Sequence, residues 1–588
     1  MVNKLIVVLL RVWAFCSTCL AISDMTKSSF GIHNDGLIAA FGDFNSDELT
    51  DAFIIRNASA LEVFLAHDKE PFLRPSCFAC NFSNILVTSI VPGDFDGDAY
   101  MDILFTTKNA VSSNLHEVRI LWGGMPTLNC SDAFLVKAVT VGEPLVIDYN
   151  RDMILDLFGI NIRNERVFWV FDNSRSPPKE IQMINKIPKE VKLPHSHSFL
   201  DVNDDNAADL LVTTKLAIEV WLNEESNGFT HNNSIELLVG HSAIYGQALF
   251  IDVALSGQFF LVIPVCYDTK CINSTILIYD NQQWHDLQVD FNDGKGTMWR
   301  FVPPRNETYL DTITMRSGDY NMDGYPDILM TLCPVNSNDT KVYLLHNVPC
   351  HDSGCKFYRT FQIQWDKFES FERNVVMATF YDFYMDGVLD IIYVEKNTTT
   401  KYILHAFRNE LEYDTNFMKV IVVTGLTNPR VPVINGTLYS RKVTFGTNLP
   451  GPKIGYNTWS QEGTYRTGVC AQLSQSAYFA LQLPYSIFGL DRTPNFVDTL
   501  NVGLSGYSRS WTQIIPNSQI VVVPSPPDDA SQWKAQLFVT PSKVILKSVF
   551  VLTAVIGIIT GCVLYLHWKE RNDRQDIIEI DEKTYVKI

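Results

Sequence analysis

An acidic frame nine residues long recurs along this chain. It places Asp at position 1, Asp or Asn at position 3 and Asp at positions 5 and 9, and an apolar run follows it. The frame begins at seven points, 51 to 67 residues apart, and we number these loops 1 to 7: Asp43, Asp94, Asp148, Asp201, Asp252, Asp319 and Asp382. Seven copies of one unit at this period indicate a closed repeat architecture, in which each copy packs on its neighbours.

The spacing of the acids predicts a calcium-binding loop. Oxygens at positions 1, 3 and 5 point into one tight turn and a carboxylate at position 9 closes the shell, while calcium takes about six to eight oxygen ligands. An EF-hand would need Glu at position 12 and a following helix, but here position 12 lies in runs of strand-forming residues. The predicted ligands of the five complete loops are Asp43, Asn45, Asp47, Asp51; Asp94, Asp96, Asp98, Asp102; Asp148, Asn150, Asp152, Asp156; Asp201, Asn203, Asp205, Asp209; and Asp319, Asn321, Asp323, Asp327.

Loops 5 and 7 depart from the frame. Loop 5 keeps only Asp252, whereas loop 7 has Asp382, Asp386 and Asp390 but carries Tyr384 at position 3, where an oxygen ligand is needed. We expect loop 7 to bind calcium weakly or not at all, and the sequence leaves open whether either loop takes metal. Calcium is therefore predicted as a structural cofactor of the five complete loops.

The whole chain is predicted to be all-β outside one membrane helix. Residues 30–411 repeat short strand-forming runs around each loop, which predicts a seven-bladed β-propeller. Residues 412–543 lack the loops but remain rich in strand formers, which predicts a membrane-proximal, sandwich-like β domain. Within it we expect strands at 419–423, 476–482 and 519–523.

Two apolar segments predict export and a membrane anchor. Residues 1–21 read as a signal peptide, although Arg11 interrupts the apolar region and an uncleaved anchor is the alternative. Residues 546–568 include a run from Val549 to Trp568 without a charge, long enough to cross a bilayer as a helix, with a buried core helix as the alternative. The basic-biased stretch after Trp568 predicts a cytoplasmic tail at 569–588 and a single-pass type I protein of the plasma membrane.

Sequons and charge agree with an extracellular N-terminal domain. The formal net charge of −18 argues against a nucleic-acid partner, which would need a basic surface. Cys266 with Cys271 and Cys350 with Cys355 are candidate local disulfides, and the odd number of exported cysteines leaves a thiol over. Nine Asn-x-Ser/Thr sequons lie between the two apolar segments, at Asn57, Asn81, Asn129, Asn232, Asn273, Asn306, Asn338, Asn397 and Asn435.

The C-terminus carries two short candidate motifs. Tyr585 to Ile588 fits a tyrosine-based sorting signal, and the last three residues fit a ligand that adds a strand to a PDZ-type groove. A cytosolic adaptor would be the partner of Tyr585 and Ile588, and an inert terminus is the alternative.

The Asp loops, with Phe41-Gly42 before the first, resemble FG-GAP repeats, the blades of the integrin α-subunit propeller. The whole arrangement, and above all Gln475 to Gly489, Asn495-Phe496 and Ile515 to Gln519, is similar to the Linkin / T-cell immunomodulatory protein family. This resemblance implies a surface glycoprotein linked to cell adhesion and T-cell modulation. An integrin α-chain is excluded because the chain lacks the leg domains and the Gly-Phe-Phe-Lys-Arg signature after the span.

Two functions remain open. The first is a non-catalytic receptor or adhesion ectodomain that binds an extracellular or cell-surface protein through its propeller. The alternative is a lectin or enzyme that uses the propeller channel on a glycan or lipid. The chain contains no nucleophile elbow, HExxH or Walker motif, and His195 and His197 follow Pro194 in an expected loop. We therefore expect no catalytic residues.

Overall fold

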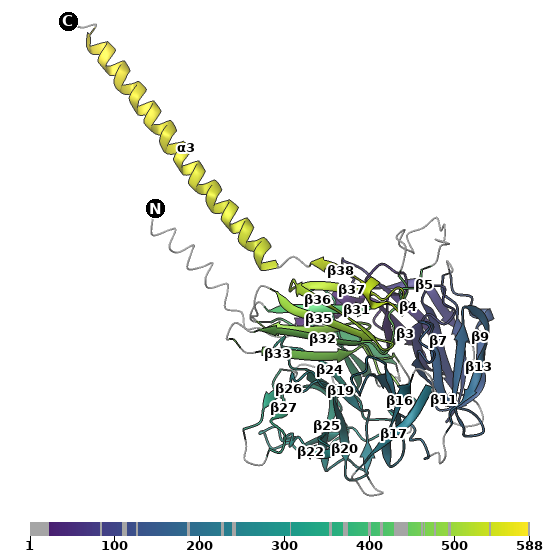
Figure 1. The fold of residues 1–588 in the computed structure, drawn as a ribbon. Coiled ribbons are helices and arrows are strands. Elements are labelled where there is room, and N and C mark those ends of the chain that lie inside the picture. Colours follow the sequence, from purple (N-terminus) through teal and green to yellow (C-terminus); the bar gives the residue numbers. More distant parts are fainter. Residues whose placement is uncertain are drawn as a thin grey trace. The chain divides into compact units, whose positions relative to one another are not determined.

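The computed structural model describes residues 23–82, 85–108, 114–124, 127–184, 189–224, 228–237, 243–305, 307–351, 355–367, 374–397, 401–411, 415–427, 445–459, 463, 465–475, 478–491, 496–539 and 543–585. Residues up to Phe538 form one compact unit and those from Val539 onward form a second. Over the described residues, the first unit is built of strands with one short α-helix, α2 (Thr26–Phe30), and two 3-10 turns, Cys130–Asp132 and Ala530–Gln532. The second unit contains one long helix. The predicted all-β fold with one C-terminal apolar helix is confirmed (Figure 1).

Strands β1 to β30 form seven antiparallel sheets of four or five strands, which we number in chain order. Sheets 1 to 4 contain β2 (Leu37–Gly42), β3 (Asp51–Arg56), β4 (Ala60–Ala66), β5 (Leu73–Asn81); β6 (Val87–Gly93), β7 (Asp102–Lys108), β8 (Leu115–Leu121), β9 (Phe134–Val141); β10 (Leu145–Ile147), β11 (Asp156–Ile160), β12 (Arg166–Asp172), β13 (Ser174–Gln182); and β14 (Ser198–Leu200), β15 (Asp209–Thr213), β16 (Ala217–Glu224), β17 (Gly228–Glu236). Sheets 5 to 7 contain β18 (Ile244–Tyr245), β19 (Leu249–Ile251), β20 (Phe260–Cys266), β21 (Ser274–Asp280), β22 (Gln283–Asp286); β23 (Trp299–Phe301), β24 (Met315–Gly318), β25 (Asp327–Pro334), β26 (Lys341–Pro349), β27 (Arg359–Ile363); and β28 (Val375–Tyr381), β29 (Asp390–Lys396), β30 (Tyr402–Arg408), β1 (Ser23–Asp24).

Burial falls from the first strand of a sheet to its last. Every residue of β2 and of β28 is buried, whereas no residue of β13 is. The sequences agree with this gradient, because β2 and β28 are runs of apolar and aromatic residues while β13 reads Ser-Arg-Ser-Pro-Pro-Lys. The strands that precede the Asp loops are therefore the inner strands, and the last strands are the more exposed ones, although three of the five residues of β27 are buried.

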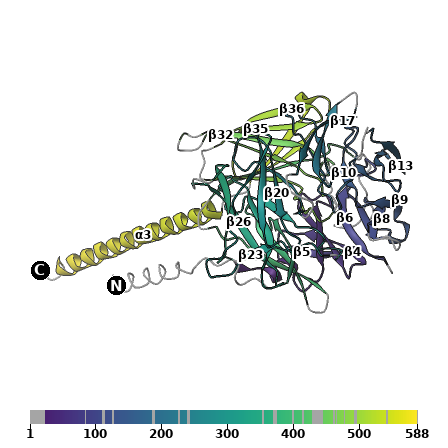
Figure 2. The ribbon, with the colours of Figure 1, turned by 90° about the horizontal axis from the view of Figure 1, so that it is seen from below.

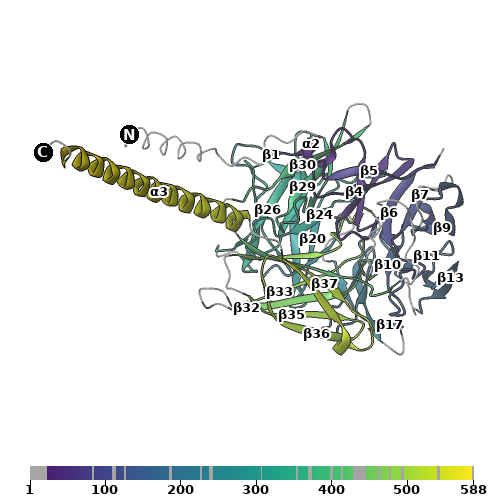
Figure 3. The same ribbon diagram turned by 90° about the horizontal axis from the view of Figure 1, so that it is seen from above.

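Apolar cores join each sheet to the next and close into a cycle. Sheets 2 and 3, 3 and 4, 4 and 5, 5 and 6, and 6 and 7 share core clusters. A single cluster then contains Phe53 of sheet 1, Ile103 of sheet 2 and Met377 of sheet 7. The N-terminal strand β1 completes sheet 7 by pairing with β30, so the two ends of this repeat region meet in one sheet. Figure 3 shows β1 and β30 side by side.

Strands β31 to β38 form two further sheets. One contains β34 (Ser486–Asp491), β31 (Asn416–Val422), β37 (Ser518–Val523) and β38 (Lys534–Val539); the other contains β33 (Tyr465–Ala471), β32 (Lys453–Trp459), β35 (Val497–Leu504) and β36 (Tyr507–Ile514). Their facing side chains, among them Val420, Tyr456 and Val502, make one apolar core, as the predicted sandwich requires. In Figure 2, β32, β35 and β36 lie together on one side of the other sheets. The strands expected at 419–423 and 519–523 are confirmed as β31 and β37.

The strand expected at 476–482 is wrong over its described part. Residues 478–482 form a turn and irregular chain, and the backbone is left-handed at Tyr478 (φ 58°), Phe479 (φ 54°) and Leu481 (φ 50°). A run of three such residues within four positions does not fit a regular strand, in which φ is negative. The apolar composition that favoured a strand has another cause, because these side chains are buried among the seven sheets.

The second unit contains helix α3 (Lys543–Tyr585). Within it, Ser548–Gln575 is long and apolar enough to cross a membrane, and none of its most apolar window is buried. The alternative of a buried core helix is therefore wrong, and one span at the C-terminal end fits a single-pass membrane protein. The expected signal at 1–21 and Ile588 lie outside the described residues, and the structure does not describe the side chain of Tyr585.

Three disulfides occur among the described residues. The two local pairs, Cys266–Cys271 and Cys350–Cys355, are as expected, while the third joins Cys80 of β5 to Cys130 just before β9 and so links sheets 1 and 2. Its two cysteines are separated by 50 residues in the sequence. A crosslink across a segment of this length removes much freedom from the unfolded chain.

We predict that Cys80→Ser destabilises the first unit by about 2–5 kcal/mol, the usual effect of losing a native disulfide. The expected observation is a lower Tm in thermal unfolding of the exported protein. Cys77→Ser is the matched control, because Cys77 is an exposed cysteine on the same strand. Equal Tm values for the two variants would contradict the prediction.

Candidate metal loops and the centre of the sheets

Each Asp loop joins the inner strand of its sheet to the next strand, and the register is the same in all seven. The residue before position 1 pairs with the residue at position 9, as in Gly42 with Asp51, Gly93 with Asp102 and Tyr381 with Asp390. Loop 5 keeps this register although its position 9 is Phe260. The predicted ligands at positions 1 and 9 therefore lie at the two ends of one tight turn.

The position 1 carboxylate holds the turn by accepting backbone N–H groups. In loop 2, Gly97 N and Ala99 N donate to Asp94 at 2.7 and 2.8 Å, and in loop 6 Asp323 N and Gly324 N donate to Asp319 at 3.1 and 2.8 Å. Positions 4 and 6 are left-handed in all seven loops, although most of the residues there are not glycine. The hydrogen bonds to the first Asp thus offset a conformation that L-residues disfavour.

The position 9 carboxylate joins the loop to the third strand of the sheet. The N–H of Phe95 donates to Asp102 Oδ2 at 2.9 Å and the N–H of Gly123, just after β8, donates to Asp102 Oδ1 at 2.7 Å. The same pair of bonds is made by Asp51, Asp156, Asp209 and Asp390. The Asp at position 9 therefore stabilises the sheet in addition to being a predicted metal ligand.

The loops concentrate negative charge in buried positions. Carboxylate oxygens of Asp94, Asp96 and Asp102 all lie within 4.8 Å of one another, and these three residues are buried. Burial, reinforced by the neighbouring carboxylates, raises the pKa of Asp94 to about 8 and that of Asp43 to about 7. Burial also raises the pKa of Asp327 to about 8. Such a cluster needs either protons or a bound cation to remain folded.

Some oxygens in the loops have no hydrogen-bond donor. These are Asn45 Oδ1, Asp148 Oδ1 and Asp327 Oδ2, at positions 3, 1 and 9. A buried oxygen without a donor is costly, and all three belong to the predicted calcium ligands. The side-chain amide nitrogens of Asn45, Asn150, Asn203 and Asn321 each donate to the Asp at position 5, so the amide oxygen is the atom that can face a cation. In loops 4 and 6 this oxygen also accepts the N–H of the residue at position 5. The residues present therefore fit a hard, oxygen-binding cation.

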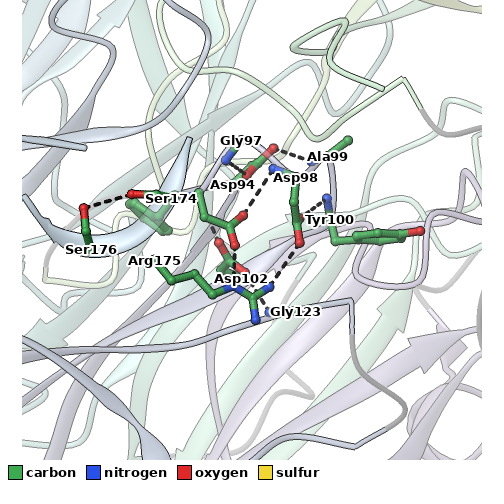
Figure 4. Close-up of polar contacts among 12 residues, drawn as sticks. Asp94, Gly97, Asp98, Ala99, Tyr100, Asp102, Gly123, Ser174, Arg175 and Ser176 are labelled. Atoms are coloured by element: carbon green, nitrogen blue, oxygen red, sulfur yellow. Dashed lines mark hydrogen bonds and ion pairs between the residues drawn. The ribbon is translucent and has the colours of Figure 1, made fainter. Parts of the chain in front are cut away.

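A neighbouring arginine adds to loop 2. Arg175, on β13 of sheet 3, donates to Asp96 Oδ2 at 2.6 Å and to Asp98 Oδ2 at 3.1 Å. Figure 4 shows its guanidinium beside the carboxylates of Asp98 and Asp102. The sequence gives no signal for this contact, because Arg175 lies 77 residues from Asp98 in an exposed strand.

The two β31–β38 sheets contact the loops from outside the cycle. Loop 3 reaches them through Arg151, which donates to the carbonyl of Ser505 at 3.4 Å, and loop 5 through a bridge between Ser256 and Thr467. In loop 6 the N–H of Gly489 donates to Asp319 Oδ2 at 3.0 Å. Loops 4 and 7 meet lysines, Lys453 at 3.4 Å from Asp201 Oδ2 and Lys419 at 3.5 Å from Asp382 Oδ2. These contacts were not predicted from the sequence.

A connection between the sandwich strands β33 and β34 fills the centre of the cycle. We call residues 474, 475 and 478–485 the central segment. It makes contacts with inner strands, or residues just before them, of six sheets: Gln475 with Phe41, Tyr478 with Glu143, His195 and Gln247, Phe479 with Arg316, and Leu481 with Thr379. Phe479 and Leu481 also join the core that sheet 2 shares with sheets 1 and 7. The centre is thus occupied by the chain itself.

His195 and His197 have structural roles at this centre. Their rings stack at 3.8 Å, His195 Nε2 lies 2.5 Å from the carbonyl oxygen of Glu143, and His197 Nδ1 accepts the N–H of Thr213 at 3.0 Å. Burial lowers the pKa of His195 to about 4 and lowers that of His197 well below its usual value, so both are neutral at physiological pH. Both rings are buried and engaged with the protein.

A polar cavity of about 460 Å³ remains beside the central segment. Glu143 and Asp311 line it together with Lys108, His116 and Arg305. Burial, with the nearby Glu143 charge, raises the pKa of Asp311 to about 7.

The sequons lie mostly on the surface. Asn57, Asn81, Asn129, Asn232, Asn273 and Asn338 are exposed and Asn397 is half-buried. Asn306 and Asn435 lie outside the described residues. The exposed positions can accept a glycan without disturbing a core.

Known proteins share this sequence over nearly its whole length. T-cell immunomodulatory protein of Homo sapiens is 37% identical over 584 residues, which cover 94% of this chain and 93% of that protein. The chain belongs to the T-cell immunomodulatory protein family. A more distant member, Protein linkin of Caenorhabditis elegans, is 25% identical over 565 residues, covering 88% of this chain and 90% of that protein. The resemblance predicted from the sequence is confirmed.

The family model "ITFG1, C2 domain" matches residues 444–538. It therefore covers β32 to β38 except the end of β38, but not β31, which lies in the middle of one sheet of this sandwich. Among solved structures, Bacillus licheniformis rhamnogalacturonan lyase PL11 is 10% identical and covers 64% of this chain and 72% of its own, with a TM-score of 0.33. A likeness at that level carries no argument.

We predict that Phe479→Ala destabilises the protein by about 3–5 kcal/mol, as expected for a buried aromatic side chain. Phe479 is 6% exposed, packs on Tyr309 at 5.3 Å and anchors the central segment. Hydrogen exchange should also accelerate in the inner strands β2, β24 and β28. The control is Phe496→Ala, a phenylalanine of the same sandwich that is 41% exposed. Unchanged Tm and unchanged exchange in Phe479→Ala would refute an anchoring role.

Proposed function

We propose that this family member is a non-catalytic, single-pass type I glycoprotein of the plasma membrane. Its seven sheets form the blades of a β-propeller stabilised by calcium, and its extracellular surface binds an extracellular or cell-surface protein. The biological role is cell adhesion, modulation of T-cell responses, or both. The relatives' names support this role, since they include T-cell immunomodulatory proteins and a linkin.

The cyclic order of shared cores supports the propeller. Seven four- or five-stranded sheets pack in sequence, the last packs on the first, and the N-terminal strand completes the last sheet. A radial array of this kind protects strand edges that would otherwise be open to aggregation. The Asp loops lie at equivalent positions in all seven sheets, as blade-to-blade repetition requires.

The oxygen-rich, buried loops support calcium. In loops 1 to 4 and 6 the ion would be held by the side chains at positions 1, 3, 5 and 9, and its role would be to neutralise carboxylates that the fold has already buried. Oxygens such as Asp148 Oδ1 and Asp327 Oδ2 are the atoms that lack another partner. Calcium here is structural.

The central segment carries the argument for binding at an outer surface. The alternative, a lectin or enzyme that uses the propeller channel, would place its ligand in the middle of the blades, where Tyr478 and Phe479 of this chain are buried. The exposed outer strands, β13 and β17, and the exposed sequons are instead available for protein contacts. This arrangement favours recognition over catalysis.

We predict that chelating calcium lowers the Tm, and more strongly at pH 8 than at pH 5.5. Burial raises the pKa values of the loop carboxylates from 3.8 to about 7 for Asp43 and about 8 for Asp94. In calcium-free protein, protonation of these buried carboxylates stabilises the folded state. This contribution is fully present below pH 3.8 and is lost as the pH rises through about 7 for Asp43 and about 8 for Asp94. Calcium replaces the protons and should restore about 2.7 kcal/mol per site at a hundredfold excess over Kd.

A matched pair of variants assigns the effect to a loop. Asp327→Asn in loop 6 should reduce the bound calcium by one ion, whereas Asp252→Asn in loop 5, which lacks the frame, should leave it unchanged. Metal analysis of purified protein gives the count. A calcium-independent Tm in protein shown to be metal-free before calcium addition would refute the structural role.

We predict that cells displaying the full-length protein attach to T cells more than cells without it, and that the attachment falls when calcium is chelated. Glycosidase treatment should increase the gel mobility of the surface protein, and a C-terminal tag should stay protected from protease on intact cells. A protease-sensitive tag would reverse the proposed orientation. Attachment equal to that of control cells at matched surface abundance would count against the adhesion role.

A further inference from the structure

Loop 7 meets a lysine at position 1, as loop 4 does, whereas the described hydrogen bonds to position 1 in loops 1, 2, 3 and 6 come from backbone N–H groups. Lys419 lies on β31, and its Nζ is 3.5 Å from Asp382 Oδ2. The Lys419 side chain is 7% exposed and that of Asp382 is 0% exposed. The ammonium also lies over the ring of Tyr485 at 3.8 Å, so this charge is held on two sides.

Strand β31, which carries Lys419, packs against loop 7. Successive side chains of a strand point to opposite faces, and Met418, Val420 and Val422 belong to the sandwich core. Phe417 and Lys419 therefore face the other way, toward the seven sheets. A Cβ added at Gly387 of loop 7 would lie 2.2 Å from the Phe417 ring, which shows how closely the two elements pack.

Loop 7 otherwise keeps the structure of a metal loop. Asp386 N and Gly387 N donate to Asp382 at 3.1 and 3.2 Å, and Asn409 N donates to Asp390 Oδ1 at 2.8 Å. Met385 and Gly387, at positions 4 and 6, have φ values of 51° and 78°. The turn and its three carboxylates are therefore retained although the frame is incomplete.

Position 3 supplies no ligand to this loop. The Tyr384 ring packs on Phe72 of sheet 1 at 4.9 Å and under the guanidinium of Arg408 at 4.5 Å. The residue that replaces Asp or Asn thus joins loop 7 to the neighbouring sheet. Three buried or half-buried acids remain, and they still require a positive charge.

We propose that the Lys419 ammonium is the resident cation of loop 7, where it takes the place of calcium and fastens the sandwich to sheet 7. The proposal rests on the calcium-binding role proposed for the complete loops. Loop 4 is different, because Lys453 contacts Asp204 outside the frame as well as Asp201, and Asn203 keeps position 3. Among the described loops, loop 7 alone combines a missing ligand with an internal ammonium.

The test uses purified full-length protein and its variants, with bound calcium counted by native mass spectrometry and Tm measured with and without added calcium. Lys419→Met should lower the Tm, because it leaves the carboxylates of loop 7 without a counter-charge. Tyr384→Asn supplies the missing position 3 oxygen and so completes the frame, but it should bind no additional calcium while Lys419 remains. The double variant Tyr384→Asn, Lys419→Met should bind one additional calcium and recover Tm only when calcium is added.

Two comparisons complete the design. Lys453→Met should create no additional site, since loop 4 already has its own frame. Asp382→Asn combined with Lys419→Met should be more stable than Lys419→Met alone, which tests the ion pair even if the single variant folds poorly. Three outcomes would each overturn the proposal. They are an additional calcium ion in Tyr384→Asn alone, no additional calcium ion in Tyr384→Asn, Lys419→Met, and a Tm of Asp382→Asn, Lys419→Met no higher than that of Lys419→Met. If the wild-type protein binds no calcium at any loop, the calcium role proposed for the complete loops is refuted. The comparison that tests the ion pair of Lys419 and Asp382 remains valid in that case.

Discussion

The first Asp of each loop makes the interaction on which the rest of the structure depends. Its carboxylate accepts backbone N–H groups two to five residues further along, and this holds two left-handed residues in a turn that reverses the chain between the inner strand and the next. Loop 5 demonstrates that this is sufficient for the turn. Asp252 alone accepts N–H groups from Ala254, Ser256 and Gly257, and the register of its sheet is the same as in the complete loops.

Burying these carboxylates creates a need for positive charge that different loops meet differently. The guanidinium of Arg175 in sheet 3 pairs with loop 2, and lysine ammonium groups of the sandwich contact loops 4 and 7. In loop 6 the N–H of Gly489 donates to the first Asp. The acidic turns thereby become the surface on which the sandwich packs against the seven sheets. The charge of the loops and the attachment of the sandwich to the seven sheets have one physical cause.

The sequence predicts the parts of this molecule that repeat. Seven occurrences of one acidic spacing locate the loops, and the β-branched and aromatic runs beside them locate the inner strands, because both signals are local. Arg175, Lys419 and Gly489 were not predicted, since each contacts a loop from far along the chain and occurs only once. The strand predicted at 476–482 was wrong over residues 478–482 for a related reason. Their apolar side chains are buried by other segments of the chain and not within a sheet. Hydrophobicity alone does not distinguish these two kinds of burial.

The central segment occupies the middle of the seven sheets, and this bears on where a partner could bind. It leaves β33 at Ala471 and reaches β34 at Ser486, so a connection between two sandwich strands fills the middle of the seven sheets. Tyr478 and Phe479 are buried there by contacts with residues from separate sheets, and removing them would expose apolar inner strands. A ligand entering the centre would have to displace this packing, whereas the outer strands and their glycan acceptors need no rearrangement to meet a partner. The positions of these aromatic residues therefore support the proposed recognition at the outer surface.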